Sequence, residues 1–170
     1  MKWVVWIGAF LIFLVAVVAA IGAMLPKSHR GTRRARFRQK PEAVYATIAG
    51  PPTWRGDVKD FGGLSETGGR KQWWEQDRHG QKITYELVDD SPPSRRVVRI
   101  TDKNLPYGGT WTFEIAPEPQ GSSLRIIEDG EVYNVIFRFI SRFVFGYTGT
   151  IERCLRDLGR KFGEITIIEE

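Results

Sequence analysis

Residues 134–163 read NVIFRFISRFVFGYTGTIERCLRDLGRKFG, and their apolar side chains recur with the period of an α-helix. Steps of three and four residues predict one long amphipathic helix from Asn134 to about Gly163, which has to bury an aromatic-rich stripe. Gly146 and Gly149 each weaken a helix by about 1 kcal/mol, so they mark either a close approach of backbones or a bend. The stripe comprises Ile136, Ile140, Phe143, Tyr147, Ile151, Leu155, Leu158 and Phe162.

Short strand-like segments precede this helix at intervals of about ten residues, and each interval contains Gly or Pro. Trp111, Phe113 and Ile115 alternate with threonine and glutamate, which is typical of a strand with one apolar and one wet face. The pattern predicts an antiparallel sheet. Its strands are expected at Val58–Leu64, Arg70–Gln76, Gln81–Val88, Arg95–Ile100, Thr110–Ala116 and Ser123–Val132.

One more strand and a short helix are predicted upstream of these segments. Residues 30–38 alternate, with Ala35 and Phe37 on one face, and indicate a first strand. Residues 40–49 indicate a short helix, because Pro41 stands at its first turn and Gly50 follows its end. This order predicts an α+β fold in which a curved antiparallel sheet of six to seven strands grips the C-terminal helix. The gap between sheet and helix is the natural ligand pocket.

Residues 3–25, WVVWIGAFLIFLVAVVAAIGAML, contain no charge and no proline. As a helix they extend roughly 35 Å, enough to cross a hydrocarbon core of about 30 Å. We therefore predict a transmembrane anchor over residues 1–26. The alternative is a signal peptide cleaved within residues 1–22, which would make the protein secreted or periplasmic. The apolar run is longer than the usual signal-peptide core of about 7–15 residues.

Basic residues gather directly after the anchor. The chain carries a net charge of +5, but residues 27–40, the basic collar, hold seven Lys or Arg and no acid. By the positive-inside rule the collar places the rest of the chain in the cytoplasm, as a single-pass protein of the inner membrane. We expect the collar to contact anionic lipid headgroups through Arg30, Arg33 and Arg34, some of which are also outward positions of the first strand.

The remaining chain argues against nucleic-acid binding and against familiar catalytic chemistry. Residues 41–170 hold 17 basic and 20 acidic residues, so no basic surface is expected on the domain. Cys154 falls on the apolar stripe, His29 lies in the collar, and His79 lies in a predicted turn. Because no metal-ligand spacing, phosphate loop or nucleophile–base pair stands out, we expect no metal, no cofactor and no catalytic residue.

Five short motifs are spread over the predicted domain: Pro41–Tyr45, Trp73–Glu75, Gly109–Glu114, Glu128–Glu131 and Ile136–Phe143. Together they resemble the START-like superfamily, specifically its polyketide cyclase/dehydrase and lipid-transport group (SRPBCC). The resemblance covers about residues 30–165. It implies a helix-grip fold with a deep cavity lined by the concave sheet and the C-terminal helix. Members of the group include lipid carriers, hydrophobic-ligand receptors and aromatase/cyclases.

Aromatic side chains define the candidate ligand site, since there are more of them between sheet and helix than a thin core needs. Only one of the adjacent Trp73 and Trp74 can face the pocket, and Glu75 shares the face of Trp73. Glu75 and Glu128 are candidate polar anchors, although Glu128 lies near a strand end where carboxylates are usually solvated or paired with arginine. The candidate lining residues are Trp74, Tyr85, Trp111, Phe113, Phe139, Phe143 and Tyr147.

The sequence therefore predicts a membrane-anchored START-like protein that binds, and transports or senses, a hydrophobic ligand such as a lipid, quinone or polyketide-like molecule. Its expected partners are the bilayer through residues 3–25, anionic headgroups through residues 27–40, and the small ligand. One alternative is an enzyme of the cyclase/dehydratase kind that acts on an apolar substrate in the same cavity. The other is an interaction or regulatory module without a ligand.

Overall fold

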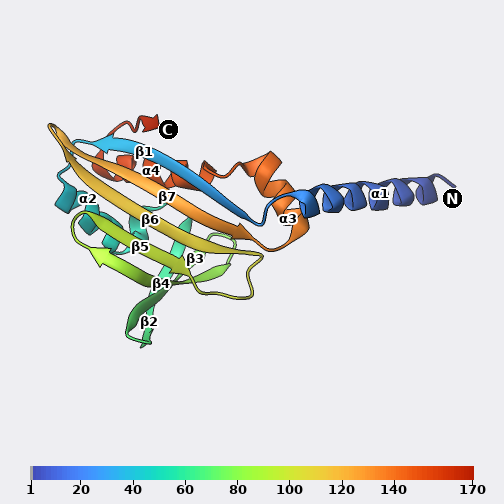
Figure 1. The fold of residues 1–170 in the computed structure, drawn as a ribbon, viewed down its shortest axis with the longest axis horizontal. Coiled ribbons are helices and arrows are strands. Elements are labelled where there is room, and N and C mark those ends of the chain that lie inside the picture. Colours follow the sequence, from blue (N-terminus) through green and yellow to red (C-terminus); the bar gives the residue numbers. More distant parts are fainter. Residues whose placement is uncertain (1) are drawn as a thin grey trace.

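An antiparallel sheet forms the body of the protein (Figure 1). The computed structural model describes residues 2–170, and within them eight strands make one sheet in the order β2-β3-β4-β5-β6-β7-β1-β8. Strands β2 to β7 form a meander, and β1 extends it by pairing with β7. The strands are β1 (Ser28–Phe37), β2 (Val58–Thr67), β3 (Arg70–Asp77), β4 (Lys82–Ser91), β5 (Arg95–Ile100), β6 (Tyr107–Glu118), β7 (Gly121–Val132) and β8 (Ile168–Glu169).

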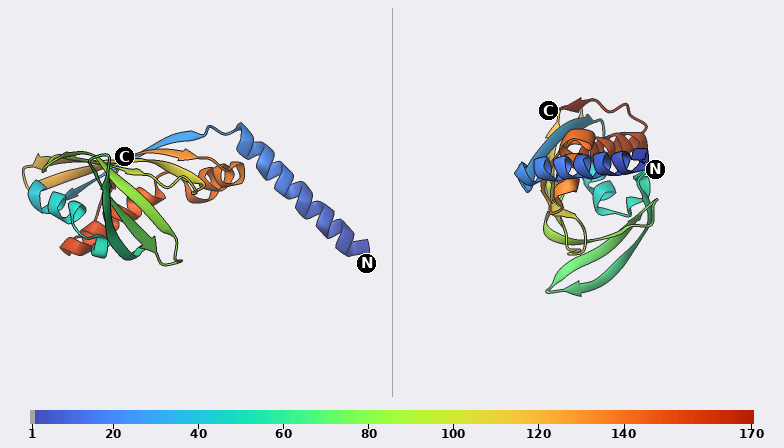
Figure 2. Two further views of the ribbon diagram at one scale, coloured as in Figure 1. Left: turned by 90° about the horizontal axis from the view of Figure 1, so that it is seen from below. Right: turned by 90° about the vertical axis from the view of Figure 1, so that its right-hand side faces the viewer.

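Helices α2 and α4 cover one face of this sheet, which we call the inner face (Figures 1 and 2). Pro41 stands at the first turn of α2, and the amide of Gly50 donates to the carbonyl of Ala46 where that helix ends. The helical elements are α1 (Lys2–Met24), α2 (Pro41–Ala49), the 3-10 turn η1 (Pro52–Trp54), α3 (Val135–Ile140), the π-helical turn η2 (Ser141–Phe145) and α4 (Gly149–Phe162).

The hydrophobic core lies between α4 and strands β1, β6 and β7. Ile151, Leu155 and Leu158 of α4 are fully buried, and burial of one such side chain stabilises the fold by about 1.5–3 kcal/mol. Cys154 is buried beside them, as its place on the apolar stripe predicted. The strands contribute Ala35, Phe37, Phe113, Ile115, Leu124 and Ile126.

The terminal helix is not continuous, which corrects the prediction of one helix from Asn134 to Gly163. Gly146 adopts φ 71°, a left-handed conformation that favours glycine, and ends the π-helical turn three residues before α4 begins. Of the two readings open for the glycines, Gly146 therefore marks a bend. Because the stripe changes direction there, only its second half meets the core, and Phe143 remains 60% exposed.

The N-terminal helix α1 leaves the domain beside α3 (Figures 1 and 2). It has 23 residues, and its most apolar stretch of 18 residues has a mean hydropathy of 3.0 and no buried residue. Such a helix has the length and composition of a membrane anchor or of a signal sequence.

The predicted fold class is confirmed as α+β, with an antiparallel sheet against a C-terminal helix. The sheet has eight strands over the described residues rather than six to seven. The additional strand, β8, has two residues and pairs with Arg34 and Ala35 of β1. A pairing this short leaves no alternation pattern in the sequence, so only the folded chain reveals it.

Candidate functional site

Aromatic side chains line the inner face from β3 to β6. Residues directly opposite in an antiparallel ladder point to the same face, and Trp73 is opposite Tyr85. Their rings stack with centroids 5.7 Å apart. On β6, Trp111 and Phe113 lie 6.0 Å apart, with Phe113 in the core cluster and Trp111 packed against it. These two pairs of rings lie on the same face, with Ile100 and Val98 of β5 between them. We call the four rings the aromatic wall, on which an apolar molecule can pack.

Trp73, rather than Trp74, takes the inward position on β3. Successive side chains of a strand alternate between faces, so Trp74 lies on the outer face, where the ammonium group of Lys82 stands 4.1 Å from its ring centroid. Glu75 shares the inner face with Trp73, and the indole nitrogen of Trp73 donates to Glu75 Oε1 at 3.1 Å. Trp73 thus replaces Trp74 in the candidate site.

A partly buried charge cluster borders the aromatic wall. Arg55, in the loop between η1 and β2, donates from Nη1 to Glu75 Oε2 at 2.8 Å and from Nη2 to Asp57 Oδ2 at 2.6 Å. The same loop is fixed to α4, because the amide of Gly56 donates to Asp157 Oδ2 at 2.7 Å. The sequence did not identify Arg55, since nothing local distinguishes it from a surface arginine.

Electrostatics in this cluster favour fixed charges on Arg55 and Asp57. Burial alone would lower the pKa of Arg55, but the carboxylates of Glu75 and Asp57 raise it above its usual range. Burial likewise tends to raise the pKa of Asp57, and the hydrogen bonds from Arg55 reverse this and lower it. Burial raises the pKa of the Tyr85 hydroxyl, and it raises the pKa of the nearby Cys154 thiol to about 12.

Tyr85 and Arg55 are desolvated, but neither is fully covered. Both retain an intermediate exposure, and the side chain of Arg55 is 22% accessible. Parts of both side chains beside the Trp73–Tyr85 stack are therefore open to contact with a bound molecule. There it would meet aromatic surface, a phenol hydroxyl and the carboxylate of Glu75, a combination of apolar walls and few polar groups that is common in ligand sites.

A second polar cluster lies where the terminal helix is broken. The ring of His29, on β1, stacks on Tyr147 with centroids 4.1 Å apart and an interplanar angle of 14°. His29 Nε2 lies 3.8 Å from Glu128 Oε1, and the hydroxyl of Thr150 donates to Glu128 Oε2 at 3.3 Å. The indole of Trp111 also hydrogen-bonds Glu128, which links this cluster to the aromatic wall.

Burial favours the neutral form of both titratable groups in this cluster. It raises the pKa of Glu128, against the hydrogen bonds from Trp111 and Thr150, and it lowers the pKa of His29. His29 Nδ1 is buried and has no hydrogen-bond partner within residues 2–170. Neutral imidazole and carboxyl groups can accept from and donate to an uncharged ligand hydroxyl or carbonyl.

Glu128 points inward, which corrects the alternative of a solvated strand-end carboxylate. It is opposite Trp111 and Gly31 in the ladder and therefore shares their face. His29 was placed in the collar by its sequence position, and only the pairing of β1 with β7 brings it beside Glu128. Nothing in the sequence indicates that these two residues, about one hundred positions apart, lie close together.

The three helix residues predicted to line the pocket fall into different places. Tyr147 lies in the break and covers His29. Phe139, in α3, is partly buried, and its ring centroid is 4.9 Å from that of Phe143 in η2. Phe143, three residues before the bend at Gly146, is 60% exposed and does not join the aromatic wall.

The arginines assigned to the membrane surface belong to β1 and have acidic partners. Arg33 faces inward and pairs with Glu152 of α4 at 3.3 Å, while Arg34 pairs with Glu118. Arg30 is exposed and lies 3.4 Å from Asp129. Their charge is thus partly neutralised within the domain.

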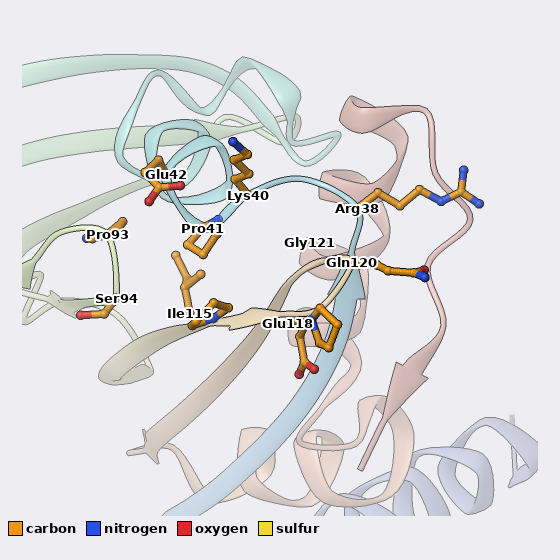
Figure 3. Close-up of a pocket in the computed structure, with 12 residues that line it drawn as sticks. Arg38, Lys40, Pro41, Glu42, Pro93, Ser94, Ile115, Glu118, Gln120 and Gly121 are labelled. Carbon is orange, nitrogen blue, oxygen red and sulfur yellow. The ribbon is translucent and has the colours of Figure 1, made fainter.

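Two surface pockets include none of the four rings of the aromatic wall, although the smaller one includes His29 of the second polar cluster. The larger, of about 640 Å³, opens between the start of α2 and the β6–β7 turn (Figure 3). Pro41 and Ile115 face each other there, whereas Arg38 points away. The smaller, of about 340 Å³, is lined by residues 28–30 and 129–131. Within residues 2–170, no group of three His, Cys, Asp or Glu side chains is arranged to hold a metal ion.

Known protein structures match this chain over most of its length. No protein-family model and no curated protein sequence matches it. Norcoclaurine synthase from Thalictrum flavum matches with a TM-score of 0.61 at 9% identity, covering 81% of this chain and 88% of that one. A protein from Mesorhizobium loti matches with a TM-score of 0.60 at 14% identity, covering 79% and 97%. The di-domain ARO/CYC protein StfQ from the steffimycin biosynthetic pathway matches with a TM-score of 0.59 at 11% identity, covering 80% of this chain and 52% of that one. The chain thus shares with these structures a helix-grip fold, an antiparallel sheet packed against a C-terminal helix.

Proposed function

We propose that this protein binds a hydrophobic small molecule on the inner face of its sheet and holds that site beside a membrane. The observation that carries the proposal is the aromatic wall of Trp73, Tyr85, Trp111 and Phe113, which is still partly accessible next to the Arg55–Glu75 pair. An apolar wall with few polar groups suits a lipid, a quinone or a polyketide-like molecule. The helix-grip architecture supports this choice, since it implies a hydrophobic cavity between sheet and helix.

In this proposal α1 remains attached and spans the inner membrane, so that residues 1–26 are the anchor, residues 27–40 the basic collar and residues 30–165 the ligand-binding domain. The excess of basic residues after α1 supports a cytoplasmic orientation of the domain by the positive-inside rule. Apolar ligands partition into bilayers, so an anchored domain meets them at high local concentration. Transport between membranes and sensing of the ligand are both compatible with this arrangement.

The test is photocrosslinking of the full chain in lipid nanodiscs with a diazirine-labelled fatty acid, followed by peptide mapping. We expect crosslinks on peptides of β3, β4 and β6 in addition to α1. Trp111→Ala should reduce the domain crosslinks, while Trp74→Ala, which removes an indole from the outer face, should leave them unchanged. Crosslinks confined to α1, or equal loss in both variants, would refute the proposal.

A second candidate function is catalysis on an apolar substrate in the same space. The observation that favours it is the buried pair of His29 and Glu128, because a carboxyl group whose pKa is raised by burial can act as a general acid or base. Two of the matched structures are named as a synthase and an ARO/CYC protein. The variant Glu128→Gln distinguishes the two functions. If the site is catalytic, this variant should still bind a substrate but no longer turn it over.

A further inference from the structure

The last turn of α1 packs directly against α3. Gly22 is the only buried residue of α1, and a Cβ atom there would lie 1.9 Å from the carbonyl oxygen of Val135. Only glycine permits this approach. Val18 and Ala19, on the same side of α1, are also less exposed than their neighbours, and Arg138 of α3 donates to the carbonyl oxygen of Leu25 at 3.5 Å. The two helices are thus joined at one level of α1.

This contact sets the depth of α3 relative to any bilayer that α1 spans. A helix of 23 residues is about 35 Å long, and Gly22 lies only about 3 Å from its end. With a hydrocarbon core of about 30 Å, Val135 then lies at the boundary between acyl chains and headgroups. The domain cannot move away from this boundary, because only residues 25–27 separate α1 from β1.

The segment held at this level exposes apolar side chains with basic side chains around them. Ile136, Phe143 and Val144 are exposed although they are large and hydrophobic. Arg142 is exposed in the same segment. Lys27, between α1 and β1, stands over the ring of Tyr133, just before α3. Exposed aliphatic and aromatic groups accompanied by Lys and Arg are typical of elements that lie in a membrane interface.

We propose that residues 133–144, the interfacial segment, insert their exposed apolar side chains into the headgroup region of the bilayer that α1 spans, with Lys27 and Arg142 on anionic headgroups. This inference rests on the proposed anchor. It also explains the bend at Gly146, because the bend separates a segment in the membrane from α4 in the core. It also orients the domain with the His29–Glu128 cluster at the end nearest the lipid.

The test uses the full chain with Cys154→Ala and one new cysteine labelled with the fluorophore NBD. Val144→Cys reports on the interfacial segment. Gln120→Cys is the matched control, since it lies in the turn at the other end of β6, about 36 Å away along the 12 residues of that strand. Both proteins are reconstituted into vesicles of phosphatidylcholine and phosphatidylglycerol that contain doxyl-labelled lipid, which quenches fluorophores in contact with the bilayer.

We expect several-fold stronger quenching at position 144 than at position 120. Equal quenching at the two positions would overturn the proposal. Alkaline extraction of the same vesicles separates this failure from failure of the anchor. If the protein stays in the membrane without quenching at position 144, the proposed anchor holds and the proposed interfacial segment is wrong. If alkali releases the protein, both proposals are wrong.

A pair of glycine variants tests whether the contact with α1 holds the segment in place. Gly22→Val, in the labelled Val144→Cys protein, should reduce quenching, because its side chain cannot fit against Val135. Gly8→Val is the control, since a Cβ at Gly8 meets no atom within 4 Å and the helix remains equally apolar. Equal quenching in the two variants would contradict the proposed role of this contact.

Discussion

Replacing Arg55 by methionine removes the positive charge between Asp57 and Glu75 while keeping an unbranched side chain of similar reach. Removal of one partner from a buried ion pair typically destabilises a protein by about 3–5 kcal/mol, because it leaves an uncompensated buried charge. Glu75 is 12% exposed, but Asp57 is 36% exposed and can regain water. Allowing for this screening, we expect Arg55→Met to lower the free energy of unfolding by about 2–3 kcal/mol.

Thermal unfolding of the full chain in a nonionic detergent, followed by tryptophan fluorescence, measures this loss. In a protein of this size each kcal/mol shifts Tm by about 2–4 °C, so we expect a decrease of about 4–12 °C. Arg95→Met is the control: Arg95 pairs with Asp89 on the surface, both side chains are more than 40% exposed, and the loss should stay below about 1 kcal/mol.

Two results would refute this reasoning. The first is a Tm of Arg55→Met as close to wild type as that of the Arg95→Met control. The second comes from the double variant Arg55→Met/Glu75→Met. If the two groups interact, the double variant is less destabilised than the sum of the single variants, by about 1–3 kcal/mol. Strict additivity would mean that the contact at 2.8 Å contributes nothing to stability.

Three further predictions concern the acid range, Glu128 and the core. Arg55 holds the pKa of Asp57 below its usual value, so the stability that Asp57 contributes is present above about pH 4 and is lost as the pH falls through the folded-state pKa. The Tm of Arg55→Met should therefore fall less steeply in acid than the Tm of the wild-type protein. Burial raises the pKa of Glu128, so ionisation of this group destabilises the folded state over the pH interval between about 4, where glutamate ionises in the unfolded chain, and its raised folded-state pKa. The Tm of Glu128→Gln relative to wild type should therefore increase over that interval, and a constant difference would contradict the burial of this carboxyl. Leu158→Ala empties a fully buried position and should cost about 2–5 kcal/mol by the same thermal assay, whereas Ile167→Ala, at a 74% exposed position, should leave Tm unchanged.

The candidate site could be predicted only in part. Tyr85, Trp111, Phe113 and Glu75 were recognised because strict alternation along a strand shows which side chains share a face. Periodicity cannot say which face of a strand meets the helix when both faces carry a large aromatic group. For that reason the adjacent Trp73 and Trp74 were indistinguishable, and the register of β3 with β4 was needed to place Trp73 beside Tyr85.

Local chemistry by itself determined the elements of this protein: the apolar α1, the strands between Gly and Pro turns, and the apolar stripe that α4 buries. Each follows from the conformational preferences and hydrophobic period of residues near one another in the chain. Only the tertiary structure decided where the terminal helix bends, that His29 lies beside Glu128, and that α3 docks on Gly22. These features join residues that are far apart in sequence. They depend on steric fit and burial, which exist only once β1 has paired with β7.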